Sequence, residues 1–226
     1  MLKPSAISII IPSLNCRALI DQLLPSALGL SNDVIVVDGG SADGTQNAAT
    51  ALGATVIEAA RGRGQQLAFG TIRAQNEWLL FLHSDTKLPA AAGEVIREFI
   101  DPPENLRKAG YFNLRFDDQS RKARLISGMA NWRSRMLGLP YGDQALLINH
   151  AFYQEIGGYK SIPLMEDVDL VRRIGRRNLC ALDGTVITSA AKYRRDGWIL
   201  RPLRNLFCLS LYFLGIAPEK IAKIYG

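Results

Sequence analysis

The sequence predicts an α/β protein with a mostly parallel central sheet and helices on both faces of that sheet. Four short apolar runs alternate with helix-compatible stretches through the first half of the chain. The apolar runs are continuous rather than alternating with polar residues, which is typical of strands buried on both faces. The resulting βαβαβαβ order favours a parallel sheet covered by helices on both sides.

Each expected element of the first half is bounded by a change in residue type. The expected strands cover residues 8–11, 34–37, 54–57 and 78–82, where β-branched or large apolar residues follow one another. Pro12 ends the first of these runs, and Asp38-Gly39-Gly40 ends the second. Helices are expected between them, over residues 17–28, 43–52 and 64–75. The second half is less regular, with strands expected at 109–116, 144–148 and 186–188 and helices at 121–136 and 166–176.

Composition and charge limit the classes of partner. The chain has 226 residues, 48% of them hydrophobic and 21% charged, so we expect one globular domain with a large core. A net charge of +6 and a pI near 9.4 suit a nucleotide or an acidic membrane face, or simply a solvated basic surface. Nucleic acid is not expected as a partner, because basic residues do not alternate with aromatic ones in any one stretch.

The predicted location is the cytoplasm, with contact to the inner face of the cell membrane left open. Three cysteines lie far apart in the sequence, which argues against a disulfide framework or a zinc site. The most apolar segment, Leu206 to Ala217, is flanked by basic residues and is shorter than the roughly 18 residues that a bilayer span needs. Such a segment suits an anionic membrane surface, a core helix or a homodimer contact.

Polar residues follow several of the expected strands, where parallel sheets bind their ligands. Asp38 comes directly after the second strand and too early to cap the next helix, so we expect it to contact a ligand, with Asp43 as the helix cap. The segment His83-Ser84-Asp85 ends the fourth strand. A loop carboxylate such as Asp85 binds Mg²⁺ or Mn²⁺ when diphosphate oxygens and waters complete the coordination. A structural histidine or a simple turn would give the same residues.

Two basic segments are candidate phosphate sites. Arg61-Gly62-Arg63-Gly64-Gln65-Gln66 precedes a helix, where backbone N–H groups and arginine side chains bind phosphate, although a flexible loop would look the same. Lys192, Arg194 and Arg195 form a later cluster that would close over a diphosphate or bind lipid headgroups.

Two acidic segments in the second half are candidates for the chemistry. Gly142-Asp143-Gln144 precedes a short strand, where Asp143 would bind an acceptor hydroxyl or shape the turn. Glu166-Asp167 begins a helix, a position that the helix dipole favours for any acid. Asp169 is spaced to pair with Arg172 or Arg173.

Together these segments resemble family-2 glycosyltransferases of the GT-A fold over essentially the whole chain. The segments that carry the resemblance are Ile9-Ile10-Ile11-Pro12-Ser13-Leu14-Asn15, Val36-Val37-Asp38-Gly39-Gly40-Ser41-Ala42-Asp43-Gly44-Thr45, His83-Ser84-Asp85, and Glu166-Asp167 followed by Leu170 and Arg173. Gly62, Arg63, Gly64 and Gln66 match a Gly-Arg-Gly-x-Gln loop of a compact bacterial subgroup. The resemblance implies a donor half at residues 1–115, an acceptor and catalytic half at 116–197, and C-terminal helices at 198–226.

The resemblance also implies a role for individual residues. Asp167 would be the general base with Glu166 beside it, and Asp85 would hold Mg²⁺ or Mn²⁺. Asp143 and Gln144 are expected at the acceptor. The nucleotide-sugar, a UDP- or GDP-sugar, is expected to contact Pro12, Ser13, Leu14, Asp38, Gly40, Arg63, Gln66, His83, Ser84 and Arg195. Two positions depart from the family pattern: Cys16 follows Asn15 where many relatives carry an acid, and His83 replaces the first acid of an Asp-x-Asp motif.

The predicted function is therefore inverting sugar transfer from a nucleotide-diphospho-sugar to a hydroxyl of a small or lipid-linked acceptor. Two other classes remain open. A nucleotidyltransferase shares the sheet architecture but usually has a glycine- and lysine-rich loop after its first strand, where this chain has Pro12-Ser13-Leu14-Asn15. A non-catalytic protein that binds nucleotides or membranes is the second alternative, and the histidine at position 83 is the residue that favours it.

Overall fold

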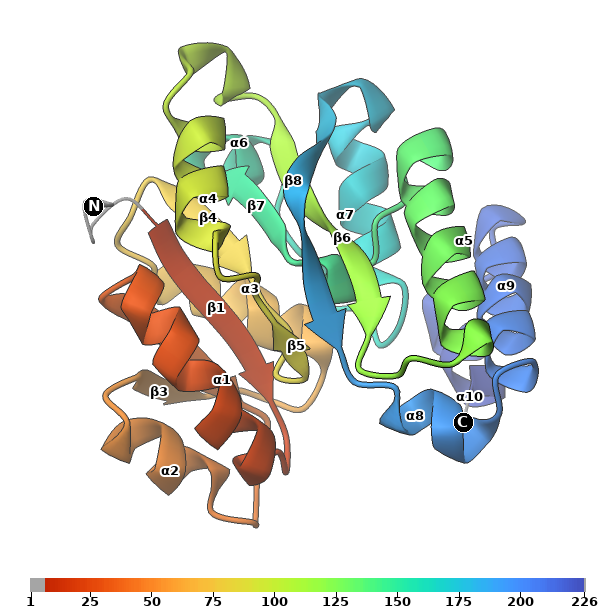
Figure 1. Cartoon of the computed structure of the whole chain (residues 1–226), viewed down its shortest axis with the longest axis horizontal. Coiled ribbons are helices and arrows are strands. Elements are labelled where there is room, and N and C mark those ends of the chain that lie inside the picture. The colour runs from red at the N-terminus through yellow and green to blue at the C-terminus, as the bar shows by residue number, and fades with distance from the viewer. Residues whose placement is uncertain (1–6, 226) are drawn as a thin grey trace.

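A computed structural model describes residues 7–225 and contains one central sheet with helices on both faces (Figure 1). The strands are β1 (Ile7–Ser13), β2 (Asp33–Asp38), β3 (Thr55–Glu58), β4 (Trp78–Phe81), β5 (Thr86–Lys87), β6 (Ala109–Phe116), β7 (Leu146–Asn149) and β8 (Leu179–Thr188). The helices are α1 (Arg17–Leu30), α2 (Thr45–Ala51), α3 (Arg63–Arg73), α4 (Ala92–Ile100), α5 (Arg121–Leu137), α6 (His150–Glu155), α7 (Glu166–Ile174), α8 (Ala191–Asp196), α9 (Leu200–Phe213) and α10 (Pro218–Tyr225).

The sheet has the strand order β3-β2-β1-β4-β7-β6-β8-β5. The first four of these strands are parallel, which confirms the predicted βαβαβαβ half. Strand β7 is antiparallel to both of its neighbours, while β6 and β8 pair in parallel. One sheet therefore joins strands from both halves of the chain, and it is mostly parallel with some antiparallel pairs.

Several elements differ from those expected from the sequence. Strand β5 and helices α4 and α6 were not predicted, and β8 begins at Leu179 rather than at residue 186. Residues Gly142–Gln144 form a 3₁₀ turn, so β7 begins only at Leu146. The two-residue strand β5 exists only because it pairs with β8, a contact between residues about a hundred positions apart that has no local sequence signal.

The prediction that Asp43 caps α2 is wrong. Gly44 occupies the N-cap position with a positive φ, and it makes no side-chain cap. Asp43 instead lies one residue earlier, where its carboxylate accepts hydrogen bonds from the backbone N–H groups of Thr45 and Arg17. Asp43, in the loop between β2 and α2, thus links the first residue of α1 to the first residue of α2.

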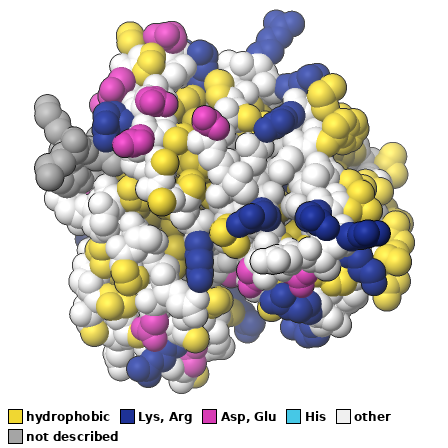
Figure 2. All heavy atoms as spheres, in the orientation of Figure 1, with side chains coloured by type: hydrophobic (Ala, Val, Ile, Leu, Met, Phe, Trp, Pro, Cys, Tyr) yellow, Lys and Arg dark blue, Asp and Glu magenta, His cyan; other side chains and the backbone are white. Residues whose placement is uncertain are grey.

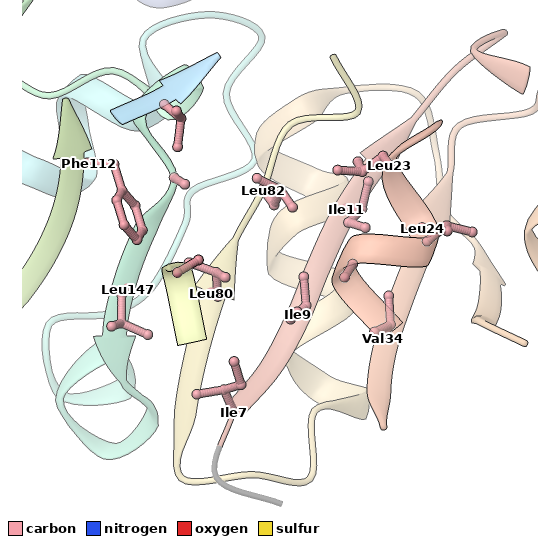
Figure 3. Packing of buried hydrophobic residues seen from close by; sticks show 14 of the residues in the cluster. Ile7, Ile9, Ile11, Leu23, Leu24, Val34, Leu80, Leu82, Phe112 and Leu147 are labelled. Atoms are coloured by element: carbon pink, nitrogen blue, oxygen red, sulfur yellow. The ribbon is translucent and has the colours of Figure 1, made fainter. Parts of the chain in front are cut away.

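Two layers of apolar side chains hold helices to the sheet. On one face, alternate β1 residues such as Ile7, Ile9 and Ile11 lie near Leu23 and Leu24 of α1 (Figure 3). Residues of α4 and part of α5 belong to the same layer. On the other face, Ile10 and its neighbours pack with α3, α6, α7, α9 and α10. Because residues of β1, β2 and β4 alternate between the two layers, these strands are apolar on both sides, as their continuous apolar sequences require.

The C-terminal helices belong to this core. Cys208 and Leu209 of α9 and Ile221 of α10 are buried in the second layer. The outer surface of α9 nevertheless exposes apolar side chains, including Leu200 and Leu203, and Figure 2 shows hydrophobic and basic groups together on that side of the molecule. Across residues 7–225, we find no helix with the length and apolar character of a membrane span.

Candidate active site

Side chains from distant segments meet in a cavity of about 120 Å³ beyond the carboxyl end of β4. Asp85, Asp143 and Asp167 are the acids in its wall. The wall also contains Arg63, His83, Phe116, Tyr141, Gly142, Thr188, Ser189, Lys192, Tyr193, Arg201, Asn205 and Tyr225. Three predicted acids and two predicted basic residues, Arg63 and Lys192, are therefore brought to one place.

Asp167 is held by two backbone N–H groups. One carboxylate oxygen accepts a hydrogen bond from Gly142 N at 3.0 Å, and the other accepts one from Val168 N at 2.7 Å. Both donors belong to helical segments, the 3₁₀ turn and the first turn of α7. They fix the direction of the carboxylate while leaving it in the cavity wall, where it can accept a further hydrogen bond.

Asp143 lies in the same wall with an oxygen, Oδ1, that is buried and has no hydrogen-bond partner. Burial raises the pKa of Asp143 to about 6, and the nearby charge of Arg133 opposes that rise. A buried acceptor without a donor is costly, so this oxygen is a natural partner for a hydroxyl group of a ligand.

Glu166 is buried behind Asp167, with only 3% of its side chain exposed, and its Oε1 lies 3.3 Å from Arg63 Nε. Burial raises the pKa of Glu166 to about 7; Arg63 counteracts this, whereas the charge of Asp167 adds to it. The ion pair connects the start of α3 to the start of α7. Glu166 therefore helps to hold the start of α7, which carries Asp167, and does not line the cavity itself.

The Gly-Arg-Gly-x-Gln loop has a separate structural reason at each position. A Cβ on Gly64 would lie 2.4 Å from Lys160 O and 3.0 Å from Glu166 Cβ, so only glycine permits this approach of α3. Arg63 pairs with Glu166. Gln66 is buried, and its Nε2 donates at 2.8 Å to both Ser13 O and Val37 O. These two bonds hold the ends of β1 and β2 together. They also occupy both N–H groups of the Gln66 amide, so the amide nitrogen is not free for the expected contact with the donor.

Asp38 organises its own loop. Its side chain is 0% exposed, and its carboxylate accepts hydrogen bonds from the N–H groups of Gly40 and Ser41, the hydroxyls of Ser13 and Ser41, and Gln46 Nε2. Burial would raise the pKa of Asp38, but these hydrogen bonds, led by those from Ser41, lower it. The carboxylate is therefore ionised and already saturated, so a direct nucleotide contact would have to displace one of these donors.

The remaining predicted donor residues of the first two strands lie along the same edge of the sheet but outside this cavity. Pro12 and Ser13 are buried at the end of β1, and Leu14 is half-buried after it. Gly40 is exposed in the loop after β2, with a φ of 88°. Because β1 lies between β2 and β4, these residues form a rim next to the cavity.

His83 and Asp85 leave β4 together, with the half-buried Ser84 between them. Asp85 Oδ2 lies 3.5 Å from Lys192 Nζ. His83 Nε2 is buried without a hydrogen-bond partner, and it faces Gly142, where a Cβ would approach it to 2.5 Å. Burial lowers the pKa of His83 to about 4, and the charge of Arg63 lowers it further. The imidazole is therefore neutral at pH 7.

Two predicted contacts do not fit the structure. The Gln144 side chain is 0% exposed, where it accepts from Ser134 Oγ and donates to Phe112 O, so it braces α5 against β6 instead of meeting an acceptor. The Arg195 side chain is 76% exposed and pairs with Asp196 outside the cavity. Lys192, three residues earlier on α8, is the member of that basic cluster that reaches the acids.

Sequence reasoning missed several cavity residues, of which Tyr141, Tyr193, Arg201 and Asn205 are the most polar. They come from the turn before Gly142 and from α8 and α9. The many basic residues between 192 and 204 indicate an anion-binding segment in the sequence. Only the fold decides which of them line the cavity, namely Lys192 and Arg201.

Three non-glycine residues with positive φ are next to predicted site residues in the sequence. Among residues 7–225, the non-glycine residues with positive φ are Asn15, Ala145 and Met165. Each adjoins a residue considered above, since Met165 precedes Glu166, Ala145 follows Gln144 and Asn15 follows Leu14. Such conformations cost of the order of 1–3 kcal/mol and persist where surrounding contacts enforce them, often at functional sites.

Comparison with known proteins gives the family. Residues 8–150, more than half of the chain, match the sequence family Glycosyl transferase family 2. The chain belongs to this family. The match covers β1 to β7, including Asp38, His83, Asp85 and Asp143, and ends before Asp167. No curated protein sequence matches the chain.

Several solved structures share the fold of this glycosyltransferase. Mannosyltransferase PcManGT from Pyrobaculum calidifontis, in complex with GDP-Man and Mn²⁺, aligns with a TM-score of 0.69 at 19% identity, over 98% of this chain and 68% of that one. S. aureus TarS 1-349 with UDP-GlcNAc gives 0.63 at 16%, over 81% and 58%. Glucosyl-3-phosphoglycerate synthase from Mycobacterium tuberculosis, with Mn²⁺, UDP and glucosyl-3-phosphoglycerate, gives 0.55 at 20%, over 82% and 70%. At these identities the likeness establishes the GT-A fold.

Proposed function

We propose that this glycosyltransferase moves a sugar from a nucleotide-diphospho-sugar to an acceptor hydroxyl with inversion at the anomeric carbon. The observation that carries the proposal is the placement of Asp167 in one cavity with Asp85 and the cations Arg63, Lys192 and Arg201. A base, an acid able to hold a cation and positive groups for a diphosphate are the parts that the reaction needs.

Asp167 is the general base of the proposal. The acceptor oxygen attacks the anomeric carbon, its proton passes to the free lone pair of Asp167, and the nucleoside diphosphate leaves from the opposite face. The hydrogen bonds from Gly142 and Val168 hold the carboxylate ready for this step. Glu166 positions α7 through its pair with Arg63.

The residues present fit a divalent cation bound together with the diphosphate. Asp85 supplies one carboxylate, and the neutral His83 supplies an unpartnered buried nitrogen in the same wall. In the part of the chain that the structure describes, no three histidine, cysteine or acidic side chains cluster as a complete protein cage. Donor oxygens would therefore have to complete the shell, as is usual for Mg²⁺. When bound, the ion neutralises charge on the departing diphosphate.

The fold neighbours, which were solved with GDP-Man, UDP-GlcNAc or UDP, support the proposed class of donor. A UDP- or GDP-sugar is accordingly proposed, bound along the rim formed by residues after β1 and β2. The acceptor is proposed to be small or lipid-linked, and the exposed apolar and basic surface of α8 and α9 suits work at the inner face of a membrane.

Calorimetric titration tests the donor site. UDP, GDP and their sugar conjugates would be titrated with and without Mn²⁺ into the wild type and Asp85→Ala, with Asp183→Ala, an exposed acid on β8, as the control. We expect metal-dependent binding of one nucleotide, lost in Asp85→Ala and kept in the control. Binding of a nucleotide without sugar transfer to any acceptor would instead favour a non-catalytic protein of the same fold.

A further inference from the structure

A second cavity, of about 650 Å³, runs between α5 and α9, which Figure 1 shows near each other at one end of the molecule. Its walls are mainly apolar. Leu125, Met129 and Trp132 line it from α5, and Leu203 and Leu206 line it from α9. Each of these five side chains is 57–64% exposed. Soluble proteins seldom leave so many large apolar groups along one hollow unless something binds there.

This groove is continuous with the candidate active site. Tyr141, Asp143, Tyr193 and Asn205 line both cavities, so they form the junction between the apolar groove and the acidic chamber. A ligand long enough to cross that junction would meet hydrocarbon-like walls on one side and Asp167 on the other.

The junction also carries unsatisfied polar atoms. Asp143 Oδ1 and Asn205 Oδ1 are both buried without a hydrogen-bond partner. Beside them the Arg133 guanidinium lies 3.4 Å from the centre of the Tyr141 ring, at the groove wall. Two open acceptors next to a cation suit a head group with hydroxyl donors. An apolar ligand alone would leave those acceptors unpaired.

Gly128 of α5 lines the groove and places no side chain in it. A Cβ built on this glycine of α5 would meet no atom within 4 Å, although leucine or alanine would favour the helix more. The space is therefore not filled by neighbouring side chains. A second copy of the chain could cover the outer faces of α5 and α9, but it would not account for the continuity with Asp143 or for the unpaired oxygens.

We propose that the groove between α5 and α9 binds the hydrocarbon chain of a lipid acceptor, with the hydroxyl-bearing head at Asp143 and Asn205 and the reacting oxygen beside Asp167. The inference deepens the proposed function and rests on it for the identity of the reacting group. The exposed apolar face of α9 beyond the groove, at Leu200 and Phe207, would rest on the membrane from which the chain enters.

The test is a chain-length series. Butyl, hexyl, octyl and decyl β-D-glucosides would be titrated calorimetrically, each below its critical micelle concentration, into the wild type. Burial of methylene groups should raise affinity by about fourfold for each added carbon until the groove is filled. Gly128→Leu should abolish this dependence by occupying the groove. Gly29→Leu is the matched control, because Gly29 is another helical glycine with an open Cβ position, on α1 and away from the groove.

A second variant tests the contact with the glucoside head group separately from the contact with the alkyl chain. Asn205→Ala should weaken every glucoside by a similar factor, because it removes a head contact and leaves the apolar walls unchanged. An affinity that does not depend on chain length in the wild type, or a dependence that survives in Gly128→Leu, would overturn the proposal. So would concentration-dependent dimerisation in sedimentation velocity that Gly128→Leu abolishes, because a second copy would then occupy the groove.

Donor titrations on the same proteins distinguish a failure of the lipid groove from a failure of the proposed donor site. Metal-dependent nucleotide binding without chain-length dependence would leave the transferase in place and remove the lipid groove. Chain-length dependence that Gly128→Leu abolishes, without binding of any nucleotide, would support the groove and contradict the proposed donor site.

Discussion

The carboxylate of Asp167 accepts a hydrogen bond from the backbone N–H of Gly142 at 3.0 Å. This contact joins the first turn of α7 to the turn that carries Asp143. Gly142 in turn packs against His83, where a side chain at position 142 would collide with the imidazole. One backbone position thus aligns the proposed base with the segment that follows β4, and the acids of the cavity are fixed relative to one another.

Asp167→Asn should abolish transfer while nucleotide affinity stays within a few-fold. Asparagine keeps an oxygen that can accept from Gly142 N but cannot take up the acceptor proton, so we expect a loss of about 10²–10⁴-fold in kcat. Turnover with a chosen donor and calorimetric nucleotide affinity would be measured together. Asp183→Asn, at an exposed acid, provides the control.

Asp143→Asn tests whether Asp143 or Asp167 is the general base. We expect this variant to raise KM for the acceptor and to change kcat by less than about tenfold, because it alters a binding contact. If Asp143→Asn loses far more turnover than Asp167→Asn, the proton goes to Asp143 and the assignment of the base is wrong.

Glu166 should make the stability of the protein depend on pH in a defined direction. Its folded pKa of about 7 lies above its ordinary value of 4.5, so the folded state binds more protons between those values. Its contribution to the unfolding free energy is therefore complete below about pH 4.5 and is lost as the pH rises to about 7. Glu166→Gln should remove this contribution.

Denaturant unfolding at several pH values checks this prediction. The quantity to compare is the difference in unfolding free energy between the wild type and Glu166→Gln. The difference is needed because burial also raises the pKa of Asp143 to about 6 and lowers that of His83 to about 4. Asp143 adds a slope of the same sign, whereas His83 stabilises the fold above its ordinary pKa and opposes that slope. A difference that is flat from pH 4.5 to 7 would contradict the burial of Glu166 beside Arg63 and Asp167.

Gly64→Ala should destabilise the fold and lower activity. The new methyl group would collide with Lys160 O and Glu166 Cβ, and overpacking of this kind typically costs about 1–3 kcal/mol. Gly29→Ala, where the Cβ position is open, should instead be neutral or stabilising by up to about 1 kcal/mol. Equal effects of the two substitutions on the unfolding free energy would show that α3 does not pack against α7 as described.

Lys192→Met should weaken binding of a nucleoside diphosphate and leave binding of the nucleoside unchanged. Lys192 lines the cavity beside Asp85, and a lost hydrogen bond to a charged group corresponds to about ten- to a hundredfold in affinity. Arg195→Met should have no such effect, because Arg195 lies outside the cavity. Calorimetry with UDP and uridine checks this. If Arg195→Met weakened UDP binding and Lys192→Met did not, Arg195 rather than Lys192 would contact the diphosphate.

Local patterns determined the first half of this fold. The runs at 8–11 and 34–37 are apolar without alternation, which is typical of strands covered on both faces, and the helix-compatible stretches between such runs favour parallel strands, as the structure has them. The helix at Glu166 and the long α5 were also predictable, because amphipathic spacing and start signals are contained within one turn or two of sequence.

The sequence by itself determined the family, the parallel half of the sheet and the acids at positions 85, 143 and 167. Only the tertiary structure decided which polar groups remain free for chemistry. Asp38, Gln66 and Gln144 look like ligand contacts in the sequence, yet their hydrogen bonds are used within the fold. The physical reason is that a buried polar group must find partners, and those partners come from strands and helices that are distant in sequence.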